Sequence, residues 1–332
     1  MDSVLDLAAA NLLSPMILFF ALGFFASMAR SDLSIPEAIA KGLSLYLMMA
    51  IGFKGGASVA QFGIDATLLK ALAAGVVLSA AMPLIAYRIL IATTSLPKVD
   101  AAAVAAHYGS ISIVTFLAMS EILKSAGIAA EGYMVAVAAA METPAIMVAL
   151  WLAHSTGKAP EGKASPRSGG IDPEMVREAL LNGSIVVLIG SFAIGCITGE
   201  KGLQSIAPFI IDPFKGVLCL FLLDMGLIAG RGLRDGARNL TPGVIAFGLY
   251  MPLIGATLGL GSAWLAGLSL GGSALMITLA ASASYIAVPA ALRLALPEAR
   301  PAIYLPLSLG VTFPFNLTFG IPLYLALAGL IH

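Results

Sequence analysis

Long apolar stretches separated by short polar segments dominate this chain. No charged residue occurs in 239–292 or in 301–331. A helix needs about 20 mainly apolar residues to cross a bilayer, so the first stretch has room for two crossings and the second for one. The alternating segments typical of a transmembrane β-barrel do not occur. The pattern therefore predicts an all-α membrane protein, because helices satisfy their own backbone hydrogen bonds in lipid.

Applied to the whole chain, the same pattern predicts about ten transmembrane helices. In chain order we place them at 14–29, 36–53, 67–92, 100–122, 132–154, 176–198, 213–229, 241–268, 272–296 and 302–331.

One polar segment divides these helices into five and five. Residues 155–173 are rich in Gly, Pro and Ser, which is typical of a linker. We therefore expect a first repeat at 1–154, a cytoplasmic linker at 155–175 and a second repeat at 176–332. Because five is odd, the second repeat enters the membrane upside down, which is the inverted-repeat plan of many secondary transporters.

Small residues recur at matching places in the two halves. Gly52 and Gly56 end the second predicted helix, and Gly226 and Gly230 end the seventh. This small-xxx-small spacing lets helices approach closely. The fifth and tenth helices also share a proline two residues after a polar side chain. Both similarities support the predicted repeat.

The distribution of basic residues predicts the orientation. Most of the 18 lysines and arginines fall on the side that carries the linker, which should therefore be cytoplasmic. Both termini are then periplasmic, in a multi-pass protein of the bacterial inner membrane. The first residues contain Asp2 and Asp6 but no basic residue, so we expect the first helix to be retained rather than cleaved.

Composition excludes several classes of function. Apolar residues make up 59% of the chain and charged residues 11%, whereas soluble domains carry about a quarter charged residues. The formal net charge is zero, which predicts no nucleic-acid partner. Walker A, GxGxxG and HExxH motifs are missing, and His107 has no nearby second metal ligand. We expect a protein that is not an enzyme and needs no cofactor except a coupling ion.

Two acidic residues fall inside predicted helices. A carboxylate at mid-membrane costs roughly 2.5–3.5 kcal/mol on insertion scales, so it usually faces a partner or a water-filled site. Glu142 is a candidate cation ligand or proton carrier, with a hydrogen-bonded packing role as the alternative. Asp224 is a second candidate, and its alternative is pairing with a basic group near the helix end.

The fourth and ninth helices carry signals of interruption. Gly109 and Pro289 can break a helix and free backbone groups. Half-helix N-termini that meet at mid-membrane attract an anion without an arginine. Hydroxyl groups beside these breaks can add hydrogen bonds, although serine in membrane helices more often mediates packing. The candidates are Ser110, Ser112, Thr115, Ser282 and Ser284.

A sodium ion requires several oxygen ligands. The prolines Pro144 and Pro314 free carbonyl groups in the fifth and tenth helices, and polar side chains lie beside them. The predicted ligands are Glu142, Thr143, Thr312 and Asn316, with Asp224 as a further candidate.

The chain resembles the sodium-dependent bicarbonate transporter family known from cyanobacteria, and looks like its proteobacterial branch. The resemblance runs nearly end to end, and no single motif decides it. It rests on Ser14-Pro15, the segments 35–39 and 96–100, Gly52 with Gly55-Gly56, Gly109, Ser112, Thr115, Pro144-Ala145, Ala281-Ser282, Pro289 and Ile321-Pro322.

The resemblance implies a ten-helix inverted repeat with core and gate domains, usually as a homotrimer. It implies bicarbonate between the broken helices and sodium near Glu142, where cyanobacterial members carry aspartate. By motif, the substrate site falls on Gly109, Ser110, Ser112, Thr115, Ser282, Ser284 and Tyr285.

The chain also departs from the cyanobacterial pattern. Tyr285 stands where those members have an acidic residue, and Asp224 and Lys54 stand where they are uncharged. These changes affect the expected ion site. The linker is shorter, which puts in doubt the small PII-like protein that regulates the cyanobacterial members.

The leading hypothesis is therefore sodium-coupled uptake of bicarbonate by alternating access. The alternative is a sodium- or proton-coupled symporter of another small or organic anion, which would need a larger and more apolar cavity. A passive channel and a membrane sensor are further alternatives from other classes.

Overall fold

The computed structural model describes residues 13–62, 66–156, 183–236, 240–285, 288–289, 292, 296 and 298–332. These parts of the chain are helical and contain no strand. The first half comprises α2 (Pro15–Met28), α3 (Glu37–Phe62), α4 (Ala66–Thr93), α5 (Lys98–Gly109), α6 (Ile113–Ser125) and α7 (Met134–Thr156). The second half comprises α9 (Gly183–Ser205), α10 (Ala207–Ile210), α11 (Phe214–Gly236), α12 (Pro242–Ala266), α13 (Leu270–Ala281), α15 (Pro301–Leu307), η2 (Ser308–Thr312), α16 (Phe313–Phe315), η3 (Asn316–Gly320), α17 (Ile321–Ala328) and η4 (Gly329–Ile331).

Local sequence explains where several helices begin and end. The Ser14 hydroxyl accepts a hydrogen bond from the Ile17 N–H at 3.4 Å, and Pro15 supplies the fixed φ of a first helical residue. Proline opens α12 in the same way. Gly267 ends α12 with a φ of 73°, a left-handed conformation that costs glycine little.

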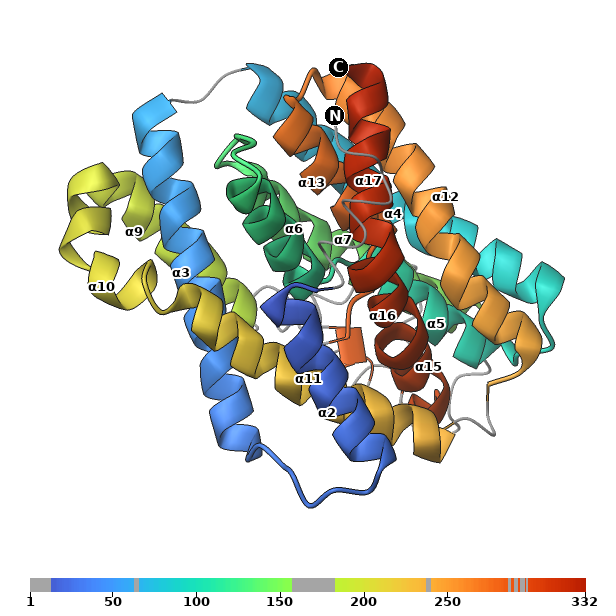
Figure 1. Cartoon of the computed structure of the whole chain (residues 1–332). Helices are drawn as coiled ribbons and strands as arrows, with labels where there is room; N and C mark the ends of the chain where they lie inside the picture. The colour runs from blue at the N-terminus through green and yellow to red at the C-terminus, as the bar shows by residue number, and fades with distance from the viewer. Residues whose placement is uncertain are drawn as a thin grey trace, which may run out of the picture.

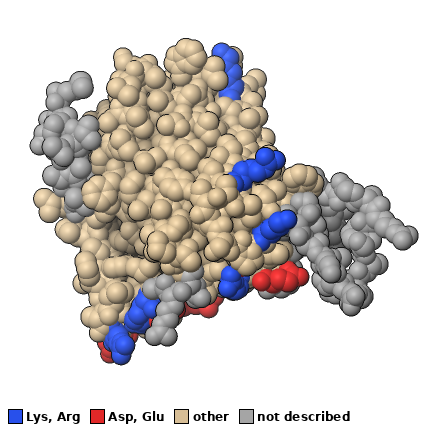
Figure 2. All heavy atoms as spheres, turned by 90° about the vertical axis from the view of Figure 1, so that its right-hand side faces the viewer, with Lys and Arg blue, Asp and Glu red and all other residues tan. Residues whose placement is uncertain are grey.

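The described helices are suited to a membrane. The described residues contain seven helical spans that are long and apolar enough to cross a bilayer, some of them made of consecutive helices such as α5 and α6, and α2 and α13 are shorter apolar helices. Large apolar side chains such as Ile197, Trp264 and Leu265 are exposed on the surface, where lipid would cover them. Figure 2 shows a face that is largely free of charge, with charged side chains mainly along its edges. The chain is a multi-pass membrane protein.

The helices pack as two groups (Figure 1). In the first, α3 lies along α9 and α2 lies along α11; we call these helices the α3 group. In the second, which we call the α4 group, α4 packs against α5, α7 and α12, and α13 packs against α12 and α17. The groups meet where α11 contacts α15 and η2, and where α3 contacts α7.

Glycine allows the backbones of the α3 group to touch. A Cβ atom on Gly56 would collide with the carbonyl oxygen of Phe192 on α9, and one on Gly226 would collide with that of Phe20 on α2. The close approach predicted from the small-xxx-small spacing is therefore confirmed at both seams.

An ion pair between the buried Asp100 and the exposed Arg300 fixes the start of α5. Asp100 lies in the first turn of α5 and accepts hydrogen bonds from Arg300 Nε at 2.9 Å and Nη2 at 2.7 Å. Its other oxygen accepts the backbone N–H of Arg300 at 2.9 Å. Since Arg300 is the N-cap of α15, the pair ties the start of α15 to the start of α5, and α15 therefore belongs to the α4 group.

Several predicted boundaries differ from the structure. The second predicted helix ends at 53, but α3 continues to Phe62. The predicted span 100–122 is broken directly after Gly109 into α5 and α6, which confirms the interruption predicted for the fourth helix. In the predicted span 272–296, α13 ends at Ala281, and most of the remaining span lies outside the described residues, as does the predicted linker.

Candidate functional site

The α4 group contains two helices that stop at serine in the same way. Each of α5 and α13 is 12 residues long. Ser110 ends α5 with φ −84° and ψ 163°, and Ser282 ends α13 with φ −87° and ψ 163°. Both serines are buried and extended, and each begins a Ser-x-Ser segment, at 110–112 and 282–284.

These two extended segments meet in the protein interior. The backbone N–H of Ser112 donates to Ser282 Oγ at 2.8 Å. The backbone N–H of Ser284 donates to the carbonyl of His107 at 2.7 Å, and His107 Nδ1 bonds to the Ser284 carbonyl at 2.5 Å. Residues about 170 apart in sequence therefore form one hydrogen-bonded unit, which we call the paired breaks.

The hydroxyl groups of the paired breaks have different partners. Ser112 Oγ caps α6, because it accepts the Thr115 N–H at 3.2 Å and the Thr115 hydroxyl at 2.9 Å. Ser282 Oγ donates to the Leu279 carbonyl at 2.9 Å. Ser110 Oγ is buried and has no hydrogen-bond partner among the described residues. The Ser110 hydroxyl is thus available to a ligand.

Gly109 and Tyr285 border the paired breaks. A Cβ atom on Gly109 would collide with the ring of Pro83 on α4 and lie 3.0 Å from Ala145 on α7, so only glycine fits there. The Tyr285 ring packs edge-to-face on Phe313 with centroids 5.1 Å apart. Its buried hydroxyl lies toward Ser112 without a hydrogen bond of good geometry.

Glu142 lies on α7, three residues before Ala145 and hence on the same helix face. It is 6% exposed, and its Oε2 has no hydrogen-bond partner in the described part of the chain. An unpaired buried carboxylate is costly, which is why such groups usually bind a cation or carry a proton. The side chain of Thr143 lies outside the described residues.

A serine of α4 inserts between the backbone groups of α7 that flank Pro144, beside Glu142. Pro144 lies inside α7, and Ser79 Oγ inserts into the hydrogen-bond ladder around it. This hydroxyl donates to the Met141 carbonyl and accepts the Ala145 N–H at 3.1 Å. The proline is therefore accommodated without ending the helix.

Thr312 and Asn316 have partners within the protein. Thr312 Oγ1 donates to the Gly248 carbonyl at 2.7 Å and lies 2.6 Å from the Tyr108 hydroxyl. Asn316 Nδ2 donates to the Ala281 carbonyl at 3.1 Å, and Asn316 Oδ1 accepts from the Tyr324 hydroxyl. Asn316 therefore contacts the end of α13, but no hydrogen bond among the described residues joins either side chain to Glu142.

Both side chains belong to π-helical turns. Thr312 ends η2 and Asn316 begins η3, on either side of Pro314. Such turns occur frequently at functional sites.

Asp224 lies apart from these residues. It is on α11 in the α3 group, is 2% exposed, and forms no ion pair with any described residue. Its Oδ2 has no hydrogen-bond partner there either. The structure does not bring Asp224 into contact with the paired breaks.

His107 is a residue of the site that the sequence analysis did not select. It is fully buried and stacks on Tyr304 with centroids 4.8 Å apart. Since the Ser284 carbonyl can only accept, Nδ1 must carry the proton that it donates. The signal for this role was the recurrence of Ser-x-Ser in the two halves, with His107 in the turn before the first copy.

We expect His107→Leu to lower the free energy of unfolding by about 1–3 kcal/mol, because it leaves the buried Ser284 carbonyl without this donor. His107→Asn should cost less, since its amide nitrogen can occupy the position of Nδ1. Chemical unfolding of the two variants in detergent measures the difference. Equal destabilisation would show that the hydrogen bond is not what matters.

The paired breaks expose both kinds of helix end. The first amides of α6 have no acceptor within the helix and carry the positive end of its dipole. The last carbonyls of α5 and α13 carry negative ends and point into the same region. Such an arrangement can hold a small anion and a cation side by side.

Comparison with known proteins gives the chain a family. No characterised protein matches the chain significantly. The family model of the Na+-dependent bicarbonate transporter superfamily matches residues 15–329, nearly the whole chain, and confirms the resemblance found in the sequence. That superfamily consists of transporters rather than enzymes. The chain belongs to the Na+-dependent bicarbonate transporter superfamily.

Proposed function

We propose that this protein takes up bicarbonate together with sodium by alternating access. The observation that carries the proposal is the pairing of the two broken helices through Ser112–Ser282 and His107–Ser284, deep in the α4 group. The positive end of α6 suits the anion, and the unpaired Glu142 carboxylate suits the cation.

The proposal includes a ten-helix inverted repeat of five plus five crossings. The equal lengths of α5 and α13 and their matching serine ends support it. Helix pairing supports it too, because the second helix of each half packs on the first helix of the other, as α3 on α9 and α11 on α2. Each of these second helices brings its glycine pair to that seam.

In this scheme the α4 group is the core domain and the α3 group is the gate domain. The substrate site comprises Gly109, Ser110, Ser112, Thr115, Ser282, Ser284 and Tyr285. The sodium site is centred on Glu142 with Thr143, while Thr312 and Asn316 support the helix ends around it. Asp224 contacts a cation at a separate position, within the gate domain.

The proposal also covers the oligomeric state, the membrane and the orientation of the protein in it. It places a homotrimer in the bacterial inner membrane with both termini periplasmic and the linker cytoplasmic. The position of the C-terminus is compatible with this, because His332 lies 3.1 Å from Ser273 near the start of α13, at the same end as the α6–α7 connection. Regulation by a PII-like protein is not part of the proposal.

The test is uptake of radiolabelled bicarbonate into proteoliposomes with and without an inward sodium gradient. We expect uptake only with sodium. Uptake driven equally by a proton gradient would change the coupling ion. If folded protein gave no uptake in any condition, bicarbonate would be excluded and an organic anion would become the substrate to test.

A further inference from the structure

Three lysines gather around one carboxylate where the two helix groups meet. Lys215 at the start of α11 forms an ion pair with Glu121 on α6 at 3.2 Å. Lys124 follows Glu121 by one helical turn, and Lys54 on α3 lies within electrostatic range of both. The Lys54 ammonium also sits 3.9 Å from the ring centroid of Phe214, the residue before Lys215.

The charges of this lysine cluster do not balance. Glu121 is the carboxylate engaged by Lys215, and no described carboxylate lies within ion-pair distance of Lys54. Lys54 is half-buried inside an apolar helix, within electrostatic range of Lys124. Contact with an aromatic ring offsets only part of the cost of such a charge. A small anion would offset the rest.

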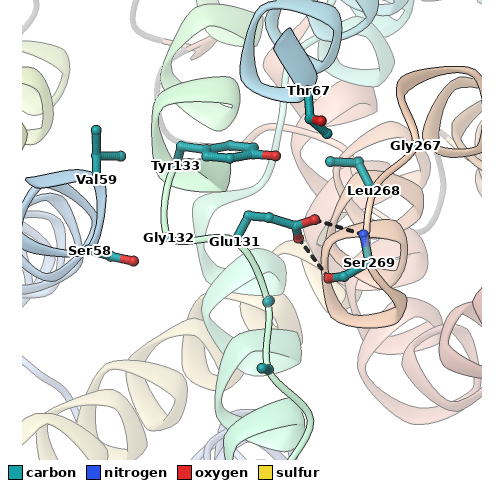
Figure 3. A pocket seen from close by; sticks show the side chains of 11 residues that line it. Ser58, Val59, Thr67, Glu131, Gly132, Tyr133, Gly267, Leu268 and Ser269 are labelled. Carbon is teal, nitrogen blue, oxygen red and sulfur yellow. Dashed lines mark hydrogen bonds between the residues drawn. The ribbon is translucent and has the colours of Figure 1, made fainter. Parts of the chain in front are cut away.

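A cavity lies one helical turn of α3 away from Lys54. It has a volume of about 560 Å³ and lies between the end of α3 and the α6–α7 and α12–α13 connections (Figure 3). Ser58 lines it and is four residues beyond Lys54, so both side chains are on the same face of α3. The cavity and Lys54 are therefore one helical turn apart.

The acidic residue of the cavity is already neutralised. Glu131 accepts the Ser269 N–H at 2.7 Å and the Ser269 hydroxyl at 2.8 Å (Figure 3). Since Ser269 is the N-cap of α13, the helix dipole further offsets this carboxylate. An anion in the cavity would lie beside a compensated Glu131, one helical turn from Lys54, which has no ion-pair partner among the described residues.

We propose that Lys54, Lys124 and Lys215 form an access site that attracts a small monovalent anion from this cavity before it reaches the paired breaks. Identifying the anion as bicarbonate rests on the proposed function. The position of the three amines at the seam between the two helix groups places the site on the path that relative movement of the groups would open.

Chemical labelling tests the site without any need for transport. Ser58→Cys, in a protein with Cys196→Ala and Cys219→Ala, reports the local potential through its reaction with anionic and cationic methanethiosulfonates. Lys54→Gln should lower the anionic-to-cationic rate ratio about tenfold, because the cluster concentrates anions. Lys54→Arg should preserve the ratio, and so should the control Lys70→Gln, which removes an exposed lysine of α4. Added bicarbonate should slow the anionic reagent only when residue 54 is cationic.

Uptake kinetics provide the second readout. Lys54→Gln should raise the KM for bicarbonate about three- to tenfold with little change in the maximal rate, as expected for weaker electrostatic attraction. An unchanged labelling ratio together with an unchanged KM would overturn the access site and leave the proposed function standing. Absence of uptake by the parent protein would overturn the proposed function, while the labelling ratio would still decide the site.

Discussion

Glu142→Gln is expected to weaken sodium binding by about 10- to 100-fold, which corresponds to the 1.5–3 kcal/mol of a charge-assisted contact. Glutamine has the same shape as glutamate but no charge. It therefore removes the buried negative charge of Glu142, whose Oε2 has no hydrogen-bond partner among the described residues. Glu142→Asp should retain sodium dependence, because it keeps the carboxylate. The sodium dependence of bicarbonate uptake measures the effect in all three proteins.

Thermal unfolding in sodium-free and sodium-containing buffer gives an independent check. Sodium that binds only the folded state should raise the Tm of the parent protein and not that of Glu142→Gln. Without sodium, the glutamine variant should be at least as stable as the parent, since it no longer buries an unpaired charge. If the variant kept full sodium dependence in both assays, Glu142 would not be a sodium ligand.

Ser110→Ala is expected to raise the KM for bicarbonate about tenfold and to leave stability unchanged. Its hydroxyl has no protein partner, so its removal breaks no hydrogen bond of the described structure. A hydrogen bond to a charged ligand contributes about 1.5–3 kcal/mol, enough for such a change. Initial uptake rates over a range of bicarbonate concentrations measure it.

Ser112→Ala is the comparison, two residues further along: Ser112 belongs to the proposed substrate site, but its hydroxyl is already bonded to Thr115. Its hydroxyl caps α6 through Thr115, so its loss should lower the free energy of unfolding by about 1 kcal/mol. The two serines should therefore separate into a ligand effect and a stability effect. An unchanged KM in Ser110→Ala would remove Ser110 from the substrate site.

The sequence predicted the membrane class and most helices, because lipid imposes long apolar spans that local composition reveals. The prediction made α3 too short, because the charged Lys54 suggests the polar end of an apolar span. In the fold this ammonium stays within the helix by packing on Phe214, a contact that depends on a distant helix. The end of such a helix cannot be found from local hydropathy alone.

Of the candidate site, the break after Gly109 was predicted from the sequence. Gly109 and the neighbouring serines marked the first break because they combine a flexible backbone with hydroxyl groups. The partners of Thr312 and Asn316 could not be foreseen, since their hydrogen bonds reach Gly248 and Ala281 on other helices. The π-helical turns around Pro314 likewise have no periodicity signal in the sequence.

The glycine seams of the α3 group constrain how this protein can move. At Gly56 and Gly226 the backbone of one helix occupies the place that a side chain would fill, so a shift of one residue along the axis would drive Cβ atoms into carbonyl groups. The pairs α3–α9 and α2–α11 are therefore locked in register. We expect sliding at the boundary with the α4 group, where α11 meets α15 and η2 and where the atom nearest to a Cβ on Gly236 belongs to the Pro306 ring rather than to a carbonyl group. The energy barrier to relative movement of the two groups is then set at that boundary, while the helix pairs joined by the glycine seams move as rigid units.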